Sequence, residues 1–106
     1  MLKSVRRRYL ALEIDCDGLV DSREFLDAVW GAVLRLYGEY GASCVGLSLI
    51  DYDVERRFAV IRVVHTAVDM VRTALASITR IGSKPVAVHV VRVSGTIRSL
   101  YKKVNK

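Results

Sequence analysis

Apolar residues follow two different spacings along this chain of 106 residues, and the order of those spacings constrains the fold more than any other feature. Short apolar or alternating runs, typical of strands, predict strands over residues 8–14, 45–50, 57–64 and 85–93. Longer runs with the helical period lie between the first two strands and between the last two. The sequence therefore predicts the order strand, helix, strand, strand, helix, strand.

Local signals place the ends of both helices. The first helix is expected over residues 21–40, opened by an aspartate and a glutamate in capping-box spacing and closed by Gly41. Thr66 and Asp69 repeat the capping spacing, and this second helix is expected to stop near Gly82.

This order of elements predicts a single α+β domain over residues 1–106. Two right-handed crossovers around one hairpin give a ferredoxin-like (RRM-like) sandwich, in which an antiparallel four-stranded sheet carries both long helices on one face. A short C-terminal helix is expected over residues 96–103. Because 52% of the residues are apolar in a domain this small, some apolar surface should be left for a partner protein.

Several classes of protein are not supported by the composition. No uncharged stretch reaches the ~20 residues that span a bilayer, and no signal peptide is recognisable, so we expect no membrane partner and a cytoplasmic location. Cys16 and Cys44 are far apart and form no CxxC motif, so we expect two small buried thiols rather than a redox or zinc site.

Charge is segregated along the chain rather than mixed. No Asp or Glu occurs from Met70 to Lys106, where eight Arg and Lys are found, and the first eight residues carry four cations and no acid. The eleven acids all lie between Tyr9 and Asp69, and the net charge is +6. Segregated basic charge is typical of proteins that bind phosphates, above all those of nucleic acids. The alternative is a solvated surface without a specific partner.

The expected topology joins the two basic segments. The first and last strands should lie antiparallel and side by side, so that the start of one meets the end of the other. We therefore predict one basic patch that binds RNA. Its candidate residues are Arg6, Arg7, Arg8, Arg92, Ser94, Gly95, Thr96, Arg98, Lys102 and Lys103.

Within this patch, the segment Ser94-Gly95-Thr96 precedes the short final helix. Amide groups at a helix start bind phosphate, and Gly95 lets the backbone come close to a ligand. The alternative is that these residues only cap the helix.

The third strand predicts a second, weaker candidate site. One face of this strand carries Phe58, Val60, Arg62 and Val64, which should lie on the open side of the sheet together with Tyr9. Aromatic residues on such a face stack on RNA bases in RNA-recognition sheets, but the signature of those domains is absent. We therefore favour a protein interface there, and expect aspartate at Val60 to weaken association while the monomer stays folded.

Catalytic chemistry finds little support in the sequence. His65 and His89 have no nucleophile motif nearby and are expected to be structural. Asp15, Asp17 and Asp21 miss the spacing of a calcium-binding loop. We therefore predict no catalytic residues and no metal ligands, and we expect the isolated chain to cut no RNA.

Five motifs follow one another along nearly the whole chain. They are Arg8-Tyr9-Leu10-Ala11; Ala28, Trp30 and Ala32 with Tyr37-Gly38-Glu39 and Gly41; Ile61-Arg62; Val71-Arg72 with Ala74-Leu75; and Val93-Ser94-Gly95-Thr96-Ile97-Arg98-Ser99-Leu100, of which the last is the most specific. In this order and spacing they resemble the ribonuclease P protein component 2 family, the archaeal counterpart of a small eukaryotic subunit shared by the ribonuclease P and MRP particles.

The resemblance implies a non-catalytic protein subunit of ribonuclease P, the endoribonuclease that removes the 5′ leader of precursor tRNA. The catalyst would be the RNA, with Mg²⁺ bound by that RNA and no cofactor bound by the chain. The implied partners are ribonuclease P RNA, precursor tRNA, ribonuclease P protein component 3 and further copies of the chain. Basic groups that screen RNA phosphates fit this role.

The alternative from another class is a small phosphohydrolase of the acylphosphatase kind, which has a similar size and topology. Such enzymes bind phosphate in the loop after the first strand. Here that loop reads Asp15-Cys16-Asp17-Gly18, which is acidic and lacks arginine, so it should repel the substrate.

Overall fold

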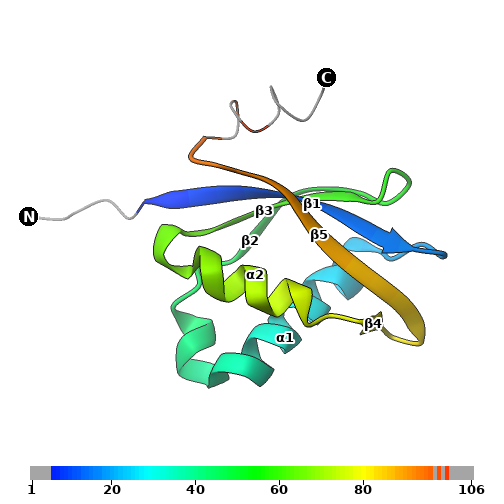
Figure 1. Cartoon of the computed structure of the whole chain (residues 1–106), viewed down its shortest axis with the longest axis horizontal. Helices are drawn as coiled ribbons and strands as arrows, with labels where there is room; N and C mark the ends of the chain where they lie inside the picture. The colour runs from blue at the N-terminus through cyan, green and yellow to red at the C-terminus, as the bar shows by residue number, and fades with distance from the viewer. Residues whose placement is uncertain (1–5, 97, 99, 101–106) are drawn as a thin grey trace, which may run out of the picture.

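A computed structural model describes residues 6–96, 98 and 100 as a curved antiparallel sheet with two helices against one face (Figure 1). The element order confirms the predicted alternation of strands and helices. The elements are β1 Arg7–Cys16, α1 Ser22–Ser43, β2 Ser48–Asp53, β3 Phe58–Val64, a 3-10 turn His65–Ala67, α2 Val68–Ala76, β4 Arg80–Ile81 and β5 Lys84–Ser94.

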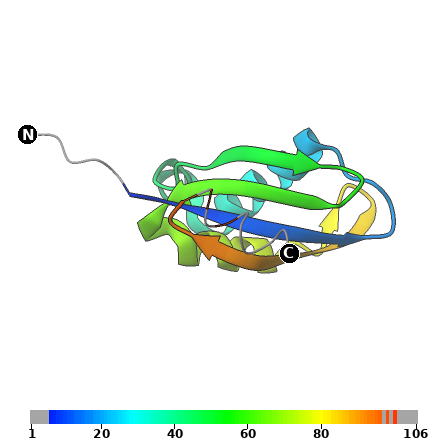
Figure 2. The same cartoon turned by 90° about the horizontal axis from the view of Figure 1, so that it is seen from above.

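The strands are ordered β2-β3-β1-β5-β4, so β1 lies in the middle with β3 and β5 on either side (Figure 2). The first four of these strands have the predicted ferredoxin-like order. The fifth was not predicted: the segment expected to continue the second helix instead forms β4, which pairs with the start of β5. Gly82, with φ of +64°, makes the turn between them, and α2 already ends at Ala76.

The main core lies between the sheet and the helices. Leu10, Leu12 and Ile14 of β1 point to the helical side and pack with Phe25 and Val29 of α1, all with at most 4% of their surface exposed. Burial of each such side chain stabilises the fold by about 1.5–3 kcal/mol. The alternation read from the sequence therefore gives the correct inner face.

A smaller cluster covers part of the opposite, open face of the sheet. Ala11 of β1, Val60 of β3 and Leu100 are fully buried against one another, with Tyr9 and Phe58 half-buried around them. The sequence-based prediction left this face open. Leu100, which follows β5, covers its centre instead.

The start of α1 confirms the predicted capping box, because Asp21 Oδ1 accepts from the Glu24 amide at 2.8 Å and Glu24 Oε1 accepts from the Asp21 amide at 3.4 Å. Its end differs from the prediction. Gly38 takes φ of +75° and interrupts the helix, and a further turn continues to Ser43. No helix among the described residues is long and apolar enough to cross a membrane.

Two other predicted boundaries and the predicted burial of one cysteine were wrong. Thr66 lies inside the 3-10 turn, and α2 starts after Ala67 without a side-chain cap. β2 starts at Ser48 rather than at residue 45, because Gly46 turns the chain with φ of +62°. Of the two cysteines, Cys16 is buried as predicted, whereas Cys44 is exposed.

Tyr52 of β2 links the sheet to the start of α1. Its hydroxyl donates to the carbonyl of Val20, and its ring lies 5.4 Å from that of Phe25. Burial, with the negative charges of Asp21 and Glu24, raises the pKa of Tyr52 to about 12. The folded protein therefore holds this phenolic proton more tightly than the unfolded chain, in which a tyrosine ionises near ~10.

This pKa predicts a loss of stability at high pH. The contribution of neutral Tyr52 to folding should be complete below pH ~10 and should be lost as the pH rises from about 10 through 12. Tyrosinate absorbance of the folded protein should show a step near 12 that Tyr52→Phe removes. If the absorbance step near pH 12 is the same in the variant and in the original protein, the assignment to Tyr52 is wrong.

Candidate nucleic-acid interface

The start of β1 and the end of β5 lie side by side, as predicted. Tyr9 pairs with Ser94, and a Cβ atom built on Gly95 would lie 3.5 Å from Nη1 of Arg8. Segments more than eighty residues apart in the sequence therefore form one surface. We call it the basic end; its described arginines are Arg6, Arg7, Arg8, Arg92 and Arg98, and the predicted Lys102 and Lys103 lie outside the described residues.

The arginines of the basic end are available to a ligand. Arg6, Arg7 and Arg98 are exposed, while Arg8 and Arg92 are half-buried. Among the described residues the ion pair found is that of Lys84 with Glu24 at 3.5 Å, and it involves none of these arginines. Cations close together attract a polyanion, which is the electrostatic requirement for binding RNA.

The turn after β5 is held by its own side chains. Ser94 Oγ accepts from the Thr96 amide at 3.3 Å, and the Leu100 amide donates to the Thr96 carbonyl at 3.2 Å, which starts a helical turn. The Thr96 amide is therefore already engaged by Ser94. Phosphate binding by Ser94, Gly95 and Thr96 stays a prediction. The hydrogen bonds of the turn set the direction in which the chain continues towards Arg98.

The four residues of the second candidate site do share the open face. Arg62 pairs with Tyr9 and Val60 pairs with Ala11, which places both on the side away from the helices. Val60 was predicted to be available to a partner protein. It has no exposed surface, however, because Leu100 covers it. Phe58, Arg62 and Val64 are half-buried, and their role in a protein interface stays a prediction.

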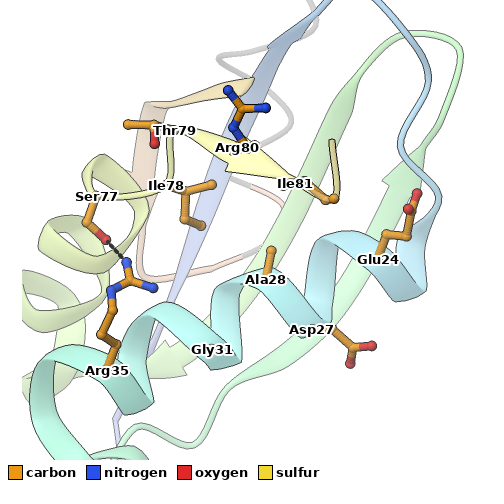
Figure 3. A pocket seen from close by; sticks show the side chains of 11 residues that line it. Glu24, Asp27, Ala28, Gly31, Arg35, Ser77, Ile78, Thr79, Arg80 and Ile81 are labelled. Atoms are coloured by element: carbon orange, nitrogen blue, oxygen red, sulfur yellow. Dashed lines mark hydrogen bonds between the residues drawn. The ribbon is translucent and has the colours of Figure 1, made fainter. Parts of the chain in front are cut away.

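A groove of about 610 Å³ lies on the helical side, between α1 and the segment from Ser77 to Gly82 (Figure 3). Arg35 reaches from α1 to Ser77, at the end of α2, and donates from Nη2 to Ser77 Oγ at 3.1 Å. Its other charged residues are Glu24, Asp27 and Arg80. With both signs of charge in its walls, this groove is a poorer fit to a polyanion than the basic end.

The histidines do not build a recognisable catalytic group. Nδ1 of His65 lies 3.3 Å from the carbonyl oxygen of Arg6, which ties the end of β3 to the start of β1. His89 of β5 is exposed and lies opposite Glu13 on the adjacent strand β1. Within residues 6–96, 98 and 100, no group of three or more His, Cys, Asp or Glu could hold a metal ion.

The loop after β1 does not resemble a phosphate cradle. The carbonyl of Gly18 accepts from Arg57 Nε at 3.4 Å, and that of Leu19 accepts from Lys84 Nζ at 3.1 Å. The loop thus directs carbonyl oxygens towards the two nearby cations, and it carries the carboxylates of Asp17 and Asp21. An acylphosphatase-like reaction would need donors at this place instead.

The fold and the basic end together define a small ferredoxin-like protein with a segregated cationic surface. The sequence profile of the Rpp14/Pop5 family matches residues 8–105, and the chain belongs to this family. Ribonuclease P protein component 2 of Pyrococcus horikoshii is 31% identical over 98 residues, which cover 92% of this chain and 82% of that protein. The protein of the same name from Methanobrevibacter smithii is 30% identical, over 93% and 88% of the two chains.

A solved structure shows the same fold. One chain in the cryo-EM structure of yeast ribonuclease MRP superposes with a TM-score of 0.72 and covers 99% of this chain and 92% of its own length, at 21% sequence identity. The similarity confirms the sandwich of a sheet and two helices, including the ferredoxin-like order predicted from the sequence.

Proposed function

We infer that this chain is a protein subunit of ribonuclease P. The observation that carries this conclusion is its membership of the Rpp14/Pop5 family over residues 8–105, together with relatives named ribonuclease P protein component 2 that align over most of both chains. Ribonuclease P is a ribonucleoprotein, so the partners of the chain are an RNA and other protein subunits.

We propose that the basic end is the surface that binds this RNA. Exposed arginines from both ends of the chain gather there, and the ion pair found among the described residues involves none of them. Their charges would screen RNA phosphates and favour a compact RNA fold. The chain would thereby support removal of the 5′ leader from precursor tRNA, while the RNA and its bound Mg²⁺ carry out the cleavage.

The protein partners that we propose are ribonuclease P protein component 3 and a second copy of this chain. The half-buried residues Phe58 and Val64 of the open face, and the exposed Leu34 and Leu36 of α1, provide apolar surface for such contacts. Apolar residues at the centre of an interface are typical of stable assemblies.

Reconstitution with purified parts tests this function. Ribonuclease P RNA and the other protein subunits of the same source should remove the 5′ leader of precursor tRNA faster when this chain is added, and the chain alone should cut no RNA. The control mixture omits only this chain. Equal leader removal with and without it, or cleavage by an RNA-free sample, would contradict the proposed role.

A further inference from the structure

Two arginines on the open face of the sheet have buried donor atoms without a partner. The Nε atoms of Arg62 on β3 and Arg92 on β5 have no exposed surface and form no hydrogen bond within the part of the chain that the structure describes. Buried polar groups are nearly always paired, because an unsatisfied donor loses its water without compensation. Two such atoms on one face leave hydrogen-bonding capacity that another molecule could use.

A β-bulge brings Arg92 onto this face. β1 pairs regularly with β5 from Cys16 to Leu12, which faces Val90, but Ala11 then faces Arg92 because Val91 is skipped. Without that extra residue, Arg92 would stand opposite Leu10 and point towards the core. Bulges commonly redirect a side chain in this way at functional sites.

The register places the two arginines on either side of β1. Arg62 pairs with Tyr9 and Arg92 pairs with Ala11, so their Cα atoms are separated by two strand spacings and two residues, roughly 12 Å. Leu100 covers Ala11 between them. Both side chains are half-buried, so each keeps some exposed surface although its Nε is shielded from water.

We propose that Arg62 and Arg92 bind backbone phosphates of an RNA strand that continues from the basic end across the open face. The inference rests on the proposed function and names a site for its ligand. A planar guanidinium donates two parallel hydrogen bonds to phosphate, and its Nε–H takes part in that fork. Because both Nε atoms are buried in this conformation, each guanidinium would turn outwards on binding, and the phosphate oxygens would then supply the acceptor that its Nε lacks.

The surroundings favour phosphate over the carboxylate of a partner protein. Arg7 and Arg8 lie at the same end of β1, whereas the acids of this face, Glu13 on β1 with Asp51 and Asp53 on β2, pair at positions towards the opposite end. A partner protein would have to offer a row of acids to match these cations. An RNA strand offers one phosphate per nucleotide, with the same chemistry at each step.

Methionine variants separate binding from packing, since methionine keeps the apolar stem and removes the donor. Arg62→Met and Arg92→Met should each weaken binding of ribonuclease P RNA to the full chain roughly fivefold at ~0.15 M salt, and each should reduce the log–log salt slope by about 0.7–0.9. The melting temperature should stay the same or rise, because an unsatisfied donor is removed. Arg62→Lys should still lose affinity, since lysine cannot form the fork.

The matched controls are Arg23→Met and Arg72→Met, which remove one exposed arginine from each helix. They should change RNA affinity much less than the two test variants. Equal losses in tests and controls would mean general charge attraction and would overturn the site. A lower melting temperature with unchanged RNA binding would assign both arginines a purely structural role. Lost association with component 3 at unchanged RNA affinity would assign them to a protein carboxylate.

A second probe keeps this site separable from the proposed function. In nuclear magnetic resonance spectra of the full chain, the Nε–H signals of Arg62 and Arg92 should shift on titration with a short single-stranded RNA. They should shift less when chloride that carries the same amount of negative charge is added in place of the RNA. Shifts without any stimulation of ribonuclease P RNA would retain the site and reject the proposed function. Unmoved signals in both arginines would overturn the site even if reconstitution succeeds.

Discussion

Val60→Asp should destabilise the monomer by about 3 kcal/mol and release Leu100 from the open face. Val60 is fully buried beneath Leu100 and beside Ala11. Keeping an unpaired carboxylate buried there would cost about 4 kcal/mol or more, whereas exposing Leu100 costs about 2–3 kcal/mol. Because the second cost is lower, Leu100 should leave the sheet. The burial of Val60 therefore changes the expectation drawn from the sequence, which was that aspartate there weakens association while the monomer stays folded.

A double-mutant cycle checks this result. Leu100→Ser should lower the free energy of urea unfolding by a similar amount, and Val60→Asp added to Leu100→Ser should cost little more, because the carboxylate is then already exposed to water. Val64→Asp is the control on the same face of β3, where a half-buried residue should cost about 1 kcal/mol. Additive losses in the double variant would show that Leu100 does not cover Val60 as described.

The sequence predicted those strands and helices that are long enough to show a period in their apolar residues. The alternation in β1 and β3 and the apolar stripe of α1 are set by the same burial that holds the main core. β4 was missed because its two residues, Arg80 and Ile81, are too few to show a period, and only pairing with β5 defines them. The interruption of α1 was misplaced because Gly38 and Gly41 both permit it, and no pattern in the sequence distinguishes Gly38, where the break occurs.

The candidate site divides in the same way. Topology alone brings Arg8 next to Gly95, so the meeting of the two basic segments could be predicted. The bulge opposite Ala11 could not, since nothing in the run of valines around Arg92 marks the skipped residue. Leu100 was also missed, because a single leucine in a basic segment has no period from which its burial could be read. These two features decide which parts of the open face remain accessible.

Neutralising the exposed arginines of the basic end should weaken RNA binding by roughly 100-fold at ~0.15 M salt. The triple variant Arg6→Gln, Arg7→Gln and Arg98→Gln removes three exposed charges of the basic end and no buried side chain. If each arginine contacts one phosphate, the log–log salt slope should become smaller by about two to three units. The loss should be similar for RNAs of different sequence, because phosphate contacts do not read bases.

A charge-matched triple variant, Arg23→Gln with Arg56→Gln and Arg72→Gln, removes three exposed arginines from α1, the turn between β2 and β3, and α2. Both triple variants have the same net charge, so long-range attraction falls equally in the two. A difference between them in affinity and in salt slope therefore measures direct contacts at the basic end. If the two proteins bind ribonuclease P RNA equally well across the salt series, the RNA is held by net charge alone, and the convergence of β1 and β5 does not create its binding surface.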